Sequence, residues 1–279
     1  MESDAAWLNM DPPERRRLCA MGNLKIGILV VAYNAQSTLR ETLRRIPPAV
    51  MSKISEVFVF DDASSDDTHA VGKALQAEEF HEGKLTVYRN PTNLMYGGNQ
   101  RCGYQYAMKQ GMDIVVLLHG DGQYAPEIMQ DLLTPLETGQ AEMVMGSRML
   151  IPGAARRGKM PLYKFYGNKI LTWTENKLAG THFSEFHSGY RAYSVKALRT
   201  IPLDSLTTNW HFDTQIILEF IKHGHRVIEV PIPTYYGDEI CRVNGIPYAA
   251  HCIAETFFYA LKYRWRRPVQ ARPTVESRA

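Results

Sequence analysis

The chain has few cysteines, and their spacing excludes two common uses of this residue. The four cysteines stand at positions 19, 102, 241 and 252, and no two of them form a CxxC pair. This spacing indicates neither a disulfide framework nor a structural zinc site. A reducing, intracellular compartment fits the pattern. We therefore expect a cytoplasmic protein, with a peripheral position on the cytoplasmic face of the membrane left open.

Long apolar runs and strong charge are also missing. No segment approaches the roughly 20 apolar residues of a membrane span, and the polar N-terminus lacks a signal-peptide core. The net charge of the 279 residues is only +3, which gives no reason to expect a nucleic-acid partner. Neither GxxxxGK[ST] nor GxGxxG occurs, which argues against a Walker NTPase or a dinucleotide enzyme.

Apolar, β-branched runs alternate with amphipathic segments through the first half of the chain. The apolar content of 45% is enough for a substantial core. The pattern predicts strands near 26–31, 56–60, 85–88, 113–118 and 142–145, and helices near 36–46, 66–79, 98–110 and 126–137. Such alternation indicates an α/β fold with a mainly parallel sheet flanked by crossover helices.

The alternation weakens after Arg148. We predict, in order, a basic loop over 151–160, a helix over 161–179, an irregular segment over 184–194, a helix over 211–223 and a strand over 226–230. For domain organisation we expect a flexible leader over 1–22, one domain over 23–240, and a C-terminal amphipathic helix with a basic tail over 241–279.

The last predicted helix, near 246–266, is rich in aromatic residues and ends in arginines. Its aromatic face could lie at an anionic membrane interface. In the alternative, Phe257, Phe258 and Leu261 pack on the body of the protein while the arginines stay in water. Of the two, we expect packing.

Three of the predicted strands end in polar residues. The ends are Ala32-Tyr33-Asn34, Asp61-Asp62 and His119-Gly120-Asp121-Gly122-Gln123. Carboxyl ends of parallel strands open on one edge of a sheet, where α/β proteins bind their ligands. A carboxylate there can accept from a base or a ribose hydroxyl, and Asp121 can bridge a divalent cation to a pyrophosphate. The sequence thus predicts a nucleoside-diphosphate site, with a plain Asp-Gly turn as the alternative for Asp121.

The order of these motifs resembles the inverting family-2 glycosyltransferases of GT-A fold. The motifs are Tyr33-Asn34, Asp61-Asp62-Ala63-Ser64-Ser65-Asp66, Asn93 with Gly97-Gly98-Asn99, and Asp121-Gly122-Gln123. Gly146-Ser147-Arg148 and the segment HSGYRAY at 187–193 narrow the resemblance to the dolichyl-phosphate mannosyltransferase and polyprenyl-phosphate glycosyltransferase branch. The resemblance extends from about residue 25 to residue 240 and implies a GT-A domain.

The resemblance also implies a donor site, a metal site and an acceptor site. The residues implied in donor binding are Ala32, Tyr33, Asn34, Asp61, Asp62, Asn93, Gly98 and Asp121. Asp121 and Gln123 would hold Mg²⁺ or Mn²⁺, which stabilises the departing nucleoside diphosphate. The residues implied in acceptor binding are Arg148, Ser188, Arg191, Trp210 and Asp213, and those implied in catalysis are Asp121, Glu185 and Arg148.

Two positions leave alternatives open. Relatives in the lipid-phosphate branch usually carry an acidic residue where this chain has His119. A neutral imidazole can still coordinate the metal, although it removes one negative charge, and the alternative is a packed histidine. Glu185 would be the general base for a hydroxyl acceptor, whereas a phosphate acceptor is already ionised and needs none. The alternative for Glu185 is a structural salt bridge or helix cap.

The sequence therefore predicts an inverting glycosyltransferase that moves a sugar from a nucleoside-diphosphate donor to a polyprenyl phosphate. GDP-mannose and UDP-hexoses are the donors that the resemblance puts first. One alternative keeps the fold but uses a hydroxyl acceptor, a glycan or a small natural product, with Glu185 as base. A second is a nucleotide-sugar-binding subunit without turnover, motivated by His119. The expected partners are the nucleotide-sugar, a lipid phosphate and a membrane surface, and the sequence sets no oligomeric state.

Overall fold

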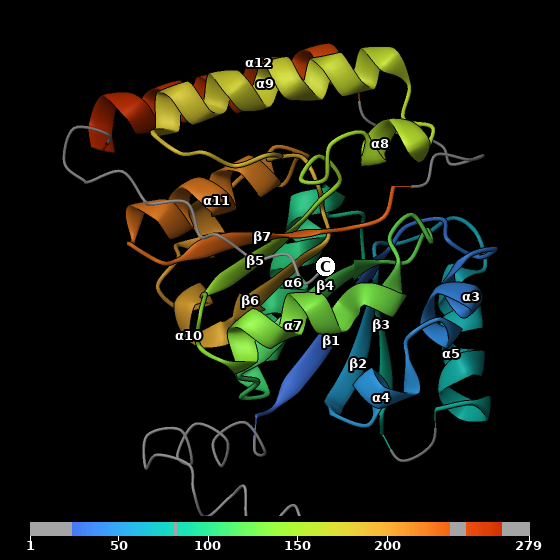
Figure 1. Ribbon diagram of the computed structural model, residues 1–279. Helices are drawn as coiled ribbons and strands as arrows, with labels where there is room; N and C mark the ends of the chain where they lie inside the picture. The colour runs from blue at the N-terminus through green and yellow to red at the C-terminus, as the bar shows by residue number, and fades with distance from the viewer. Residues whose placement is uncertain (1–23, 81–82, 235–243, 264–279) are drawn as a thin grey trace, which may run out of the picture.

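A seven-stranded sheet forms the centre of the computed structural model, which describes residues 24–80, 83–234 and 244–263 (Figure 1). Its strand order is β3-β2-β1-β4-β6-β5-β7. The strands are β1 (Ile26–Ala32), β2 (Ile54–Asp61), β3 (Leu85–Arg89), β4 (Ile114–His119), β5 (Met143–Ser147), β6 (Arg191–Ser194) and β7 (Val227–Pro231). Because β1 to β4 pair in parallel, the predicted mainly parallel α/β fold is confirmed.

Helices cover both faces of this sheet. They are α3 (Leu39–Arg44), α4 (Pro48–Met51), α5 (Thr68–Glu78), α6 (Met95–Lys109), α7 (Met129–Glu137), α8 (Ala154–Arg157), α9 (Leu162–Ala179), α10 (Val195–Leu198), α11 (Phe212–Lys222) and α12 (Gly245–Tyr263), with 3₁₀ turns at Pro126–Ile128 and Leu203–Ser205. The predicted helices and strands are thus present within a few residues of their expected ends. The predicted leader at 1–22 and the basic tail after 263 lie outside the described residues.

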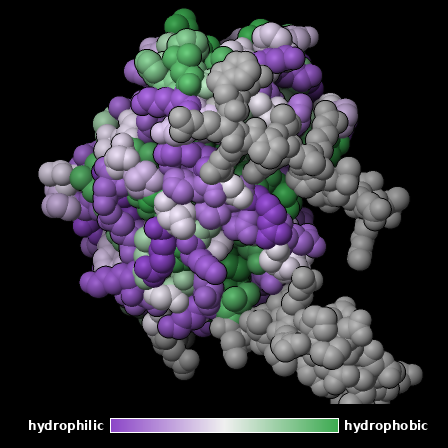
Figure 2. Space-filling view, turned by 90° about the vertical axis from the view of Figure 1, so that its left-hand side faces the viewer, coloured by the Kyte–Doolittle hydropathy of each residue, from purple (hydrophilic) through white to green (hydrophobic). Residues whose placement is uncertain are grey.

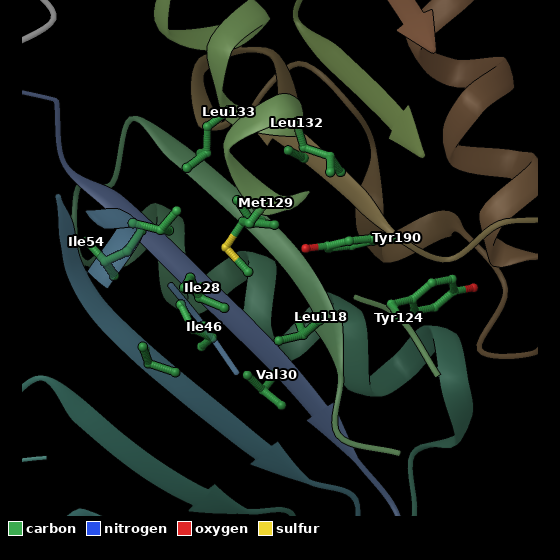
Figure 3. Packing of buried hydrophobic residues seen from close by; sticks show 14 of the residues in the cluster. Ile28, Val30, Ile46, Ile54, Leu118, Tyr124, Met129, Leu132, Leu133 and Tyr190 are labelled. Atoms are coloured by element: carbon green, nitrogen blue, oxygen red, sulfur yellow. The ribbon is translucent and has the colours of Figure 1, made fainter. Parts of the chain in front are cut away.

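The core lies on the two faces of the sheet, as the alternation of side chains along a strand requires. Ile28 and Val30 of β1 belong to the cluster under α7, and Leu29 belongs to the cluster on the opposite face. Figure 3 shows Met129 and Leu132 of α7 in the first of these clusters. Burial on both faces explains why the central strands read as continuous apolar runs.

Strand β6 corrects the expectation of an irregular segment over 184–194. It runs antiparallel between β4 and β5, with Val116 paired to Ala192 on one side and Val144 paired to Ala192 on the other. The strand has four residues and begins with the buried Arg191, so it carries no apolar alternation by which the sequence could reveal it. The predicted loop over 151–160 likewise contains the short helix α8.

The two longest helices of the described chain, α9 and α12, lie side by side at one end of the molecule (Figure 1). Cys252, Thr256 and Tyr259 form the buried face of α12. The expectation that Phe257, Phe258 and Leu261 pack on the body is wrong, since all three are exposed on the opposite face. None of the helices in the described ranges is long and apolar enough to cross a membrane.

Candidate functional site

A large cavity opens at the carboxyl ends of β1, β2 and β4. Its volume is about 1170 Å³, and its walls come from the loops after these strands, the start of α6, and the first turns of α9 and α12. The register explains the convergence, because Ala32 pairs with Asp61 and Val31 pairs with His119, which brings three strand ends to one level. The predicted sheet edge is therefore the rim of a cavity.

Most of the residues predicted from the sequence line this cavity. The lining members are Ala32, Tyr33, Asn34, Asp62, Asn93, His119, Asp121, Gln123, Arg148, Trp210 and Asp213. The predicted residues that are absent from the lining are Asp61, Gly98, Glu185, Ser188 and Arg191. Each of these five has a structural contact that explains its position.

Asn34 fastens the loop after β1 to the loop after β2. Its backbone N–H donates to Ser64 Oγ over 2.9 Å, and its side-chain Oδ1 accepts from the Ser65 N–H over 2.9 Å. The residue has a positive φ of 51°, a conformation that asparagine tolerates better than most residues. The two loops consequently form one wall of the cavity.

The neighbouring carboxylates Asp61 and Asp62 have different surroundings. Asp61 is fully buried, where it accepts from the hydroxyl and the N–H of Ser64 and lies 3.6 Å from the Arg89 Nε. Asp62 faces the cavity and accepts from the Leu94 N–H over 2.8 Å, and burial raises its pKa. Asp61 thus holds the loop, and of the two carboxylates only Asp62 lines the cavity, while donor binding by either residue stays a prediction.

The glycine pair before Asn99 serves close packing. A Cβ on Gly97 would lie 2.7 Å from Phe212 Cβ and 2.7 Å from the Thr207 carbonyl oxygen. A Cβ on Gly98 would lie 3.0 Å from Leu94 Cβ. Gly97 thus lets α6 approach Phe212 at the start of α11, and Gly98 lies close to Leu94 and Thr208, while the donor-binding role of Gly98 stays a prediction.

His119 lies among aromatic rings at the end of β4. Its ring meets Tyr96 and Tyr124 edge to face, with centroids 5.6 and 5.0 Å away. Its Nε2 lies 3.4 Å from the Tyr96 hydroxyl, and that hydroxyl donates to Asp213 Oδ2 over 2.8 Å. Burial lowers the pKa of His119, so the imidazole is neutral at pH 7. A packed, neutral histidine with one edge on the cavity fits these contacts.

Asp121 stands exposed on the cavity rim in a tight turn. Its Oδ1 accepts from the Gln123 N–H over 3.1 Å, and the intervening Gly122 has a φ of +75°. Magnesium is typically held by one or two carboxylates together with substrate phosphates and water. A single exposed carboxylate, with the Gln123 amide beside it, is a donor set of that kind. These residues fit a hard divalent cation that is shared with a diphosphate.

Arg148 and Glu185 form a buried ion pair beside the cavity. Glu185 accepts from the Arg148 backbone N–H over 2.8 Å and from the guanidinium Nε over 3.0 Å, and also from Asn168 Nδ2 over 2.8 Å. Burial alone would raise the pKa of Glu185, but the charge and hydrogen bonds of Arg148 lower it below its ordinary value. Glu185 is therefore ionised and bonded to Arg148 behind the cavity wall, which does not favour its predicted role as a base.

Arg191 and Ser188 also have structural contacts. The Arg191 side chain is fully buried, donates to the carbonyls of Phe186, Ser188 and Asp213, and lies 3.5 Å from the Asp213 carboxylate. The Ser188 hydroxyl accepts from the Tyr190 N–H over 3.3 Å. Arg191 thus holds the segment from Phe186 to Ser188 against Asp213, and acceptor contact by Arg191 or Ser188 stays a prediction.

Several contacts of lining residues join distant segments of the chain. Tyr96, which belongs to none of the sequence motifs, stacks on Trp210 with centroids 4.6 Å apart. His187 lines the cavity where its Nδ1 lies 2.9 Å from the Tyr248 hydroxyl of α12. Its Nε2 lies 3.0 Å from the buried Glu175 Oε2, and neither atom has a hydrogen-bond partner within the described residues. No motif marked these contacts between distant segments.

The mainly parallel sheet with polar residues after three strands has the GT-A architecture, and the protein is a glycosyltransferase. The model described as glycosyl transferase family 2 matches residues 27–201, and the chain belongs to this family. The family predicted from the sequence motifs is thus confirmed.

The similar proteins of known name include polyprenyl-phosphate sugar transferases. An undecaprenyl-phosphate mannosyltransferase of Micrococcus luteus is 30% identical over 214 residues, which cover 75% of this chain and 83% of that protein. A polyprenol monophosphomannose synthase of Mycolicibacterium smegmatis is 26% identical over 206 residues, covering 74% of this chain and 75% of that protein. The relatives are aligned along most of their own length.

Solved structures share the fold. Glucosyl-3-phosphoglycerate synthase from Mycobacterium tuberculosis, in complex with Mg²⁺ and UDP, superposes with a TM-score of 0.65 at 17% identity, covering 88% of this chain and 82% of that one. The same enzyme with Mn²⁺, UDP-glucose and phosphoglyceric acid gives a TM-score of 0.63 at 18% identity, covering 88% of this chain and 82% of that one. At this identity the likeness establishes the fold alone.

Proposed function

We propose that this glycosyltransferase moves a sugar from a nucleoside-diphosphate donor to a polyprenyl phosphate, with inversion at the anomeric carbon. The observation that carries the proposal is the composition of the cavity wall. It joins the strand-end carboxylates Asp62 and Asp121 with Arg148 and Asn168 in one lining. The names of the similar proteins support a lipid phosphate as acceptor.

The donor is proposed to bind along the carboxyl ends of β1, β2 and β4. Asp62 and Asn34 would contact the nucleoside, and Asp121 with Gln123 would hold Mg²⁺ or Mn²⁺ at the diphosphate. When bound, the cation neutralises the charge that develops on the leaving diphosphate. Asp121 suits this role because its carboxylate is exposed on the rim, whereas the ring of His119 is enclosed by Tyr96 and Tyr124.

Arg148 is proposed to orient the acceptor phosphate. Its side chain lines the cavity and is 11% exposed, and Glu185 fixes the guanidinium from behind. A planar guanidinium binds phosphate oxygens through paired donors, so a fixed one places the attacking oxygen. A phosphate acceptor is an anion at pH 7 and attacks without a general base. Glu185, the predicted base for the hydroxyl-acceptor alternative, is absent from the cavity lining, and so the phosphate acceptor is the one that we propose.

A donor panel tests the proposal. Purified protein is given UDP- and GDP-sugars with Mn²⁺ or Mg²⁺, and release of nucleoside diphosphate is followed with and without a short-chain polyprenyl phosphate. We expect one donor whose release the lipid phosphate stimulates. If nucleoside-diphosphate release is unchanged by the lipid phosphate but stimulated by a hydroxyl compound, the proposed polyprenyl-phosphate acceptor is wrong. Binding of a nucleoside diphosphate without any transfer or hydrolysis would instead support the non-catalytic subunit.

A matched pair of variants tests the proposed metal ligand. Asp121→Asn removes the rim carboxylate and should lower metal-stimulated release by roughly a hundredfold, since a metal supplies several kcal/mol of charge stabilisation. Asp131→Asn removes an exposed carboxylate of α7 outside the cavity and should leave release unchanged. Full activity of Asp121→Asn would refute the assignment.

A further inference from the structure

Two neighbouring helices expose an unusual amount of apolar surface. Of the fifteen large apolar side chains exposed in the described residues, ten belong to α9 and α12. Those on α9 are Leu162, Tyr163, Tyr166, Ile170 and Trp173, and those on α12 are Ile246, Ile253, Phe257, Phe258 and Leu261. We call these ten side chains the α9–α12 apolar face. A contiguous apolar patch on a folded protein marks a site of interaction.

The ten residues follow the helical repeat, so each helix presents them as one stripe. On α9 the spacing of Leu162, Tyr166, Ile170 and Trp173 keeps their side chains on one side, opposite the buried Glu175. Figure 1 shows the two helices together above the body of the protein, and Figure 2 shows green side chains gathered at that end. The face therefore points away from the rest of the described chain.

The charges on the same helices match an anionic surface. Together α9 and α12 carry the lysines Lys164, Lys169, Lys177 and Lys262, and their two glutamates are Glu175 and Glu255. Glu175 is fully buried beside His187, so it shows no charge at the surface. Tyrosine and tryptophan next to lysine are the composition of surfaces that lie in the headgroup region of a bilayer.

The cavity reaches the same two helices. Tyr163, Lys164 and Asn168 from the start of α9, and Ile246 and Tyr248 from the start of α12, belong to its lining. Tyr163 and Ile246 are also the most exposed members of the apolar face, at 75% and 85%. The face therefore continues into the cavity at the first turns of both helices.

We infer that the α9–α12 apolar face docks this protein on an anionic lipid bilayer, with the cavity mouth at the membrane surface. The occupant is the bilayer because the face combines aromatic side chains, lysines and direct continuity with the cavity. A lipid acceptor then enters between the first turns of α9 and α12 while its chain stays in the bilayer. This inference rests on the proposed function, and it names the surface from which the acceptor arrives.

Vesicle flotation of the full chain tests the inference. The probes are vesicles of phosphatidylcholine alone and of phosphatidylcholine mixed with phosphatidylglycerol. The wild-type protein should float with the anionic vesicles and bind less at high salt, since each lysine near such a surface contributes about fivefold in binding. Lys177→Glu should therefore weaken flotation by more than fivefold. Absence of wild-type flotation would overturn the inference.

A double variant and a matched control locate the surface. Trp173→Ser with Phe258→Ser removes one large side chain from each stripe, and neither residue lines the cavity. Vesicle binding should fall roughly tenfold for each side chain removed. Tyr88→Ser changes an exposed aromatic residue on β3, away from α9 and α12, and should bind vesicles as the wild type does. Equal binding by the double variant and the control would overturn the inference.

Turnover with a short-chain, water-soluble polyprenyl phosphate separates this inference from the proposed function. The double variant should retain wild-type turnover of that acceptor while it loses vesicle binding. If the wild type turns over the acceptor but does not bind vesicles, the inference of a docking surface is wrong and the proposed function stands. If it binds vesicles but turns over no acceptor, the proposed function fails. A dimer in sedimentation that the double variant dissociates, with no vesicle binding, would identify a second copy as the occupant and overturn the inference.

Discussion

Substitution of Glu185 by glutamine tests how Arg148 is held. The change keeps the size of the side chain but removes its charge, which leaves the guanidinium of Arg148 without its buried partner. Breaking a buried pair on one side costs about 3–5 kcal/mol. For a domain of this size each kcal/mol lowers Tm by roughly 2–4 °C, so Glu185→Gln should melt about 10 °C below the wild type. Turnover should also fall, because the guanidinium is no longer fixed.

The matched control is Glu127→Gln. Glu127 accepts two hydrogen bonds from Arg45, over 2.7 and 3.0 Å, in the same paired geometry, but its side chain is 50% exposed. Exposed pairs contribute at most about 1 kcal/mol, so this variant should melt close to the wild type and keep its turnover. Thermal unfolding followed by circular dichroism measures both. Equal stability and turnover of the two variants would refute the argument from burial.

The pH dependence of the same pair provides an independent check. Arg148 lowers the pKa of Glu185 in the folded state, so the unfolded chain binds the proton more readily. The pair therefore stabilises the protein fully above the ordinary glutamate pKa of about 4.3, and this stabilisation is lost as the pH falls through the lower folded pKa. The difference between the wild type and Glu185→Gln should be full at pH 7 and shrink below about pH 4. A difference that grows towards acid would contradict the sign of the shift.

Three further substitutions probe the cavity wall. Gly189→Ala would put a Cβ 2.7 Å from His119 Cε1 and 2.8 Å from the Tyr96 hydroxyl, so we expect a loss of about 1–3 kcal/mol in urea unfolding and slower release of nucleoside diphosphate. Wild-type stability and wild-type release in Gly189→Ala would contradict this, because they would show that the His119 ring moves aside without cost. Arg191→Met leaves the buried Asp213 charge unpaired and should cost about 3–5 kcal/mol in the same assay. A loss of acceptor affinity at full stability would instead restore its predicted role. Tyr96→Phe removes the 2.8 Å hydrogen bond to Asp213 and should cost about 1.5–3 kcal/mol, which an unchanged urea midpoint would contradict.

The central strands and the cavity edge could be predicted because their signals are local. The run from Ile114 to Leu118 is buried throughout, and the polar residues that follow it lie at the strand end in the structure. Asp121 on the rim and Arg148 after β5 were found for the same reason. A polar residue that directly follows a predicted parallel strand can be placed at the carboxyl edge of the sheet from the sequence alone.

Contacts between distant segments could not be predicted in this way. Nothing in the pair Asp61-Asp62 tells which carboxylate turns inward to Ser64. Arg191 has the residue type of a phosphate-binding group, and only its three carbonyl partners show that it is internal. The outward direction of Phe258 depends on which side of α12 meets α11, and that is a property of tertiary packing.

Strand β6 separates two parts of the sheet that come from different stretches of the chain. Strands β1 to β4 are complete by residue 119 and the proposed donor residues by Gln123, whereas β5, β7 and α9 with Arg148 and Asn168 all follow residue 142. Under the proposed function, the two substrate preferences are therefore encoded in separate, consecutive segments. A chimera of two such enzymes, joined between 124 and 142, should therefore take its sugar nucleotide from one parent and its acceptor from the other. Such a junction also keeps Arg191 together with its three carbonyl partners, which all follow residue 142.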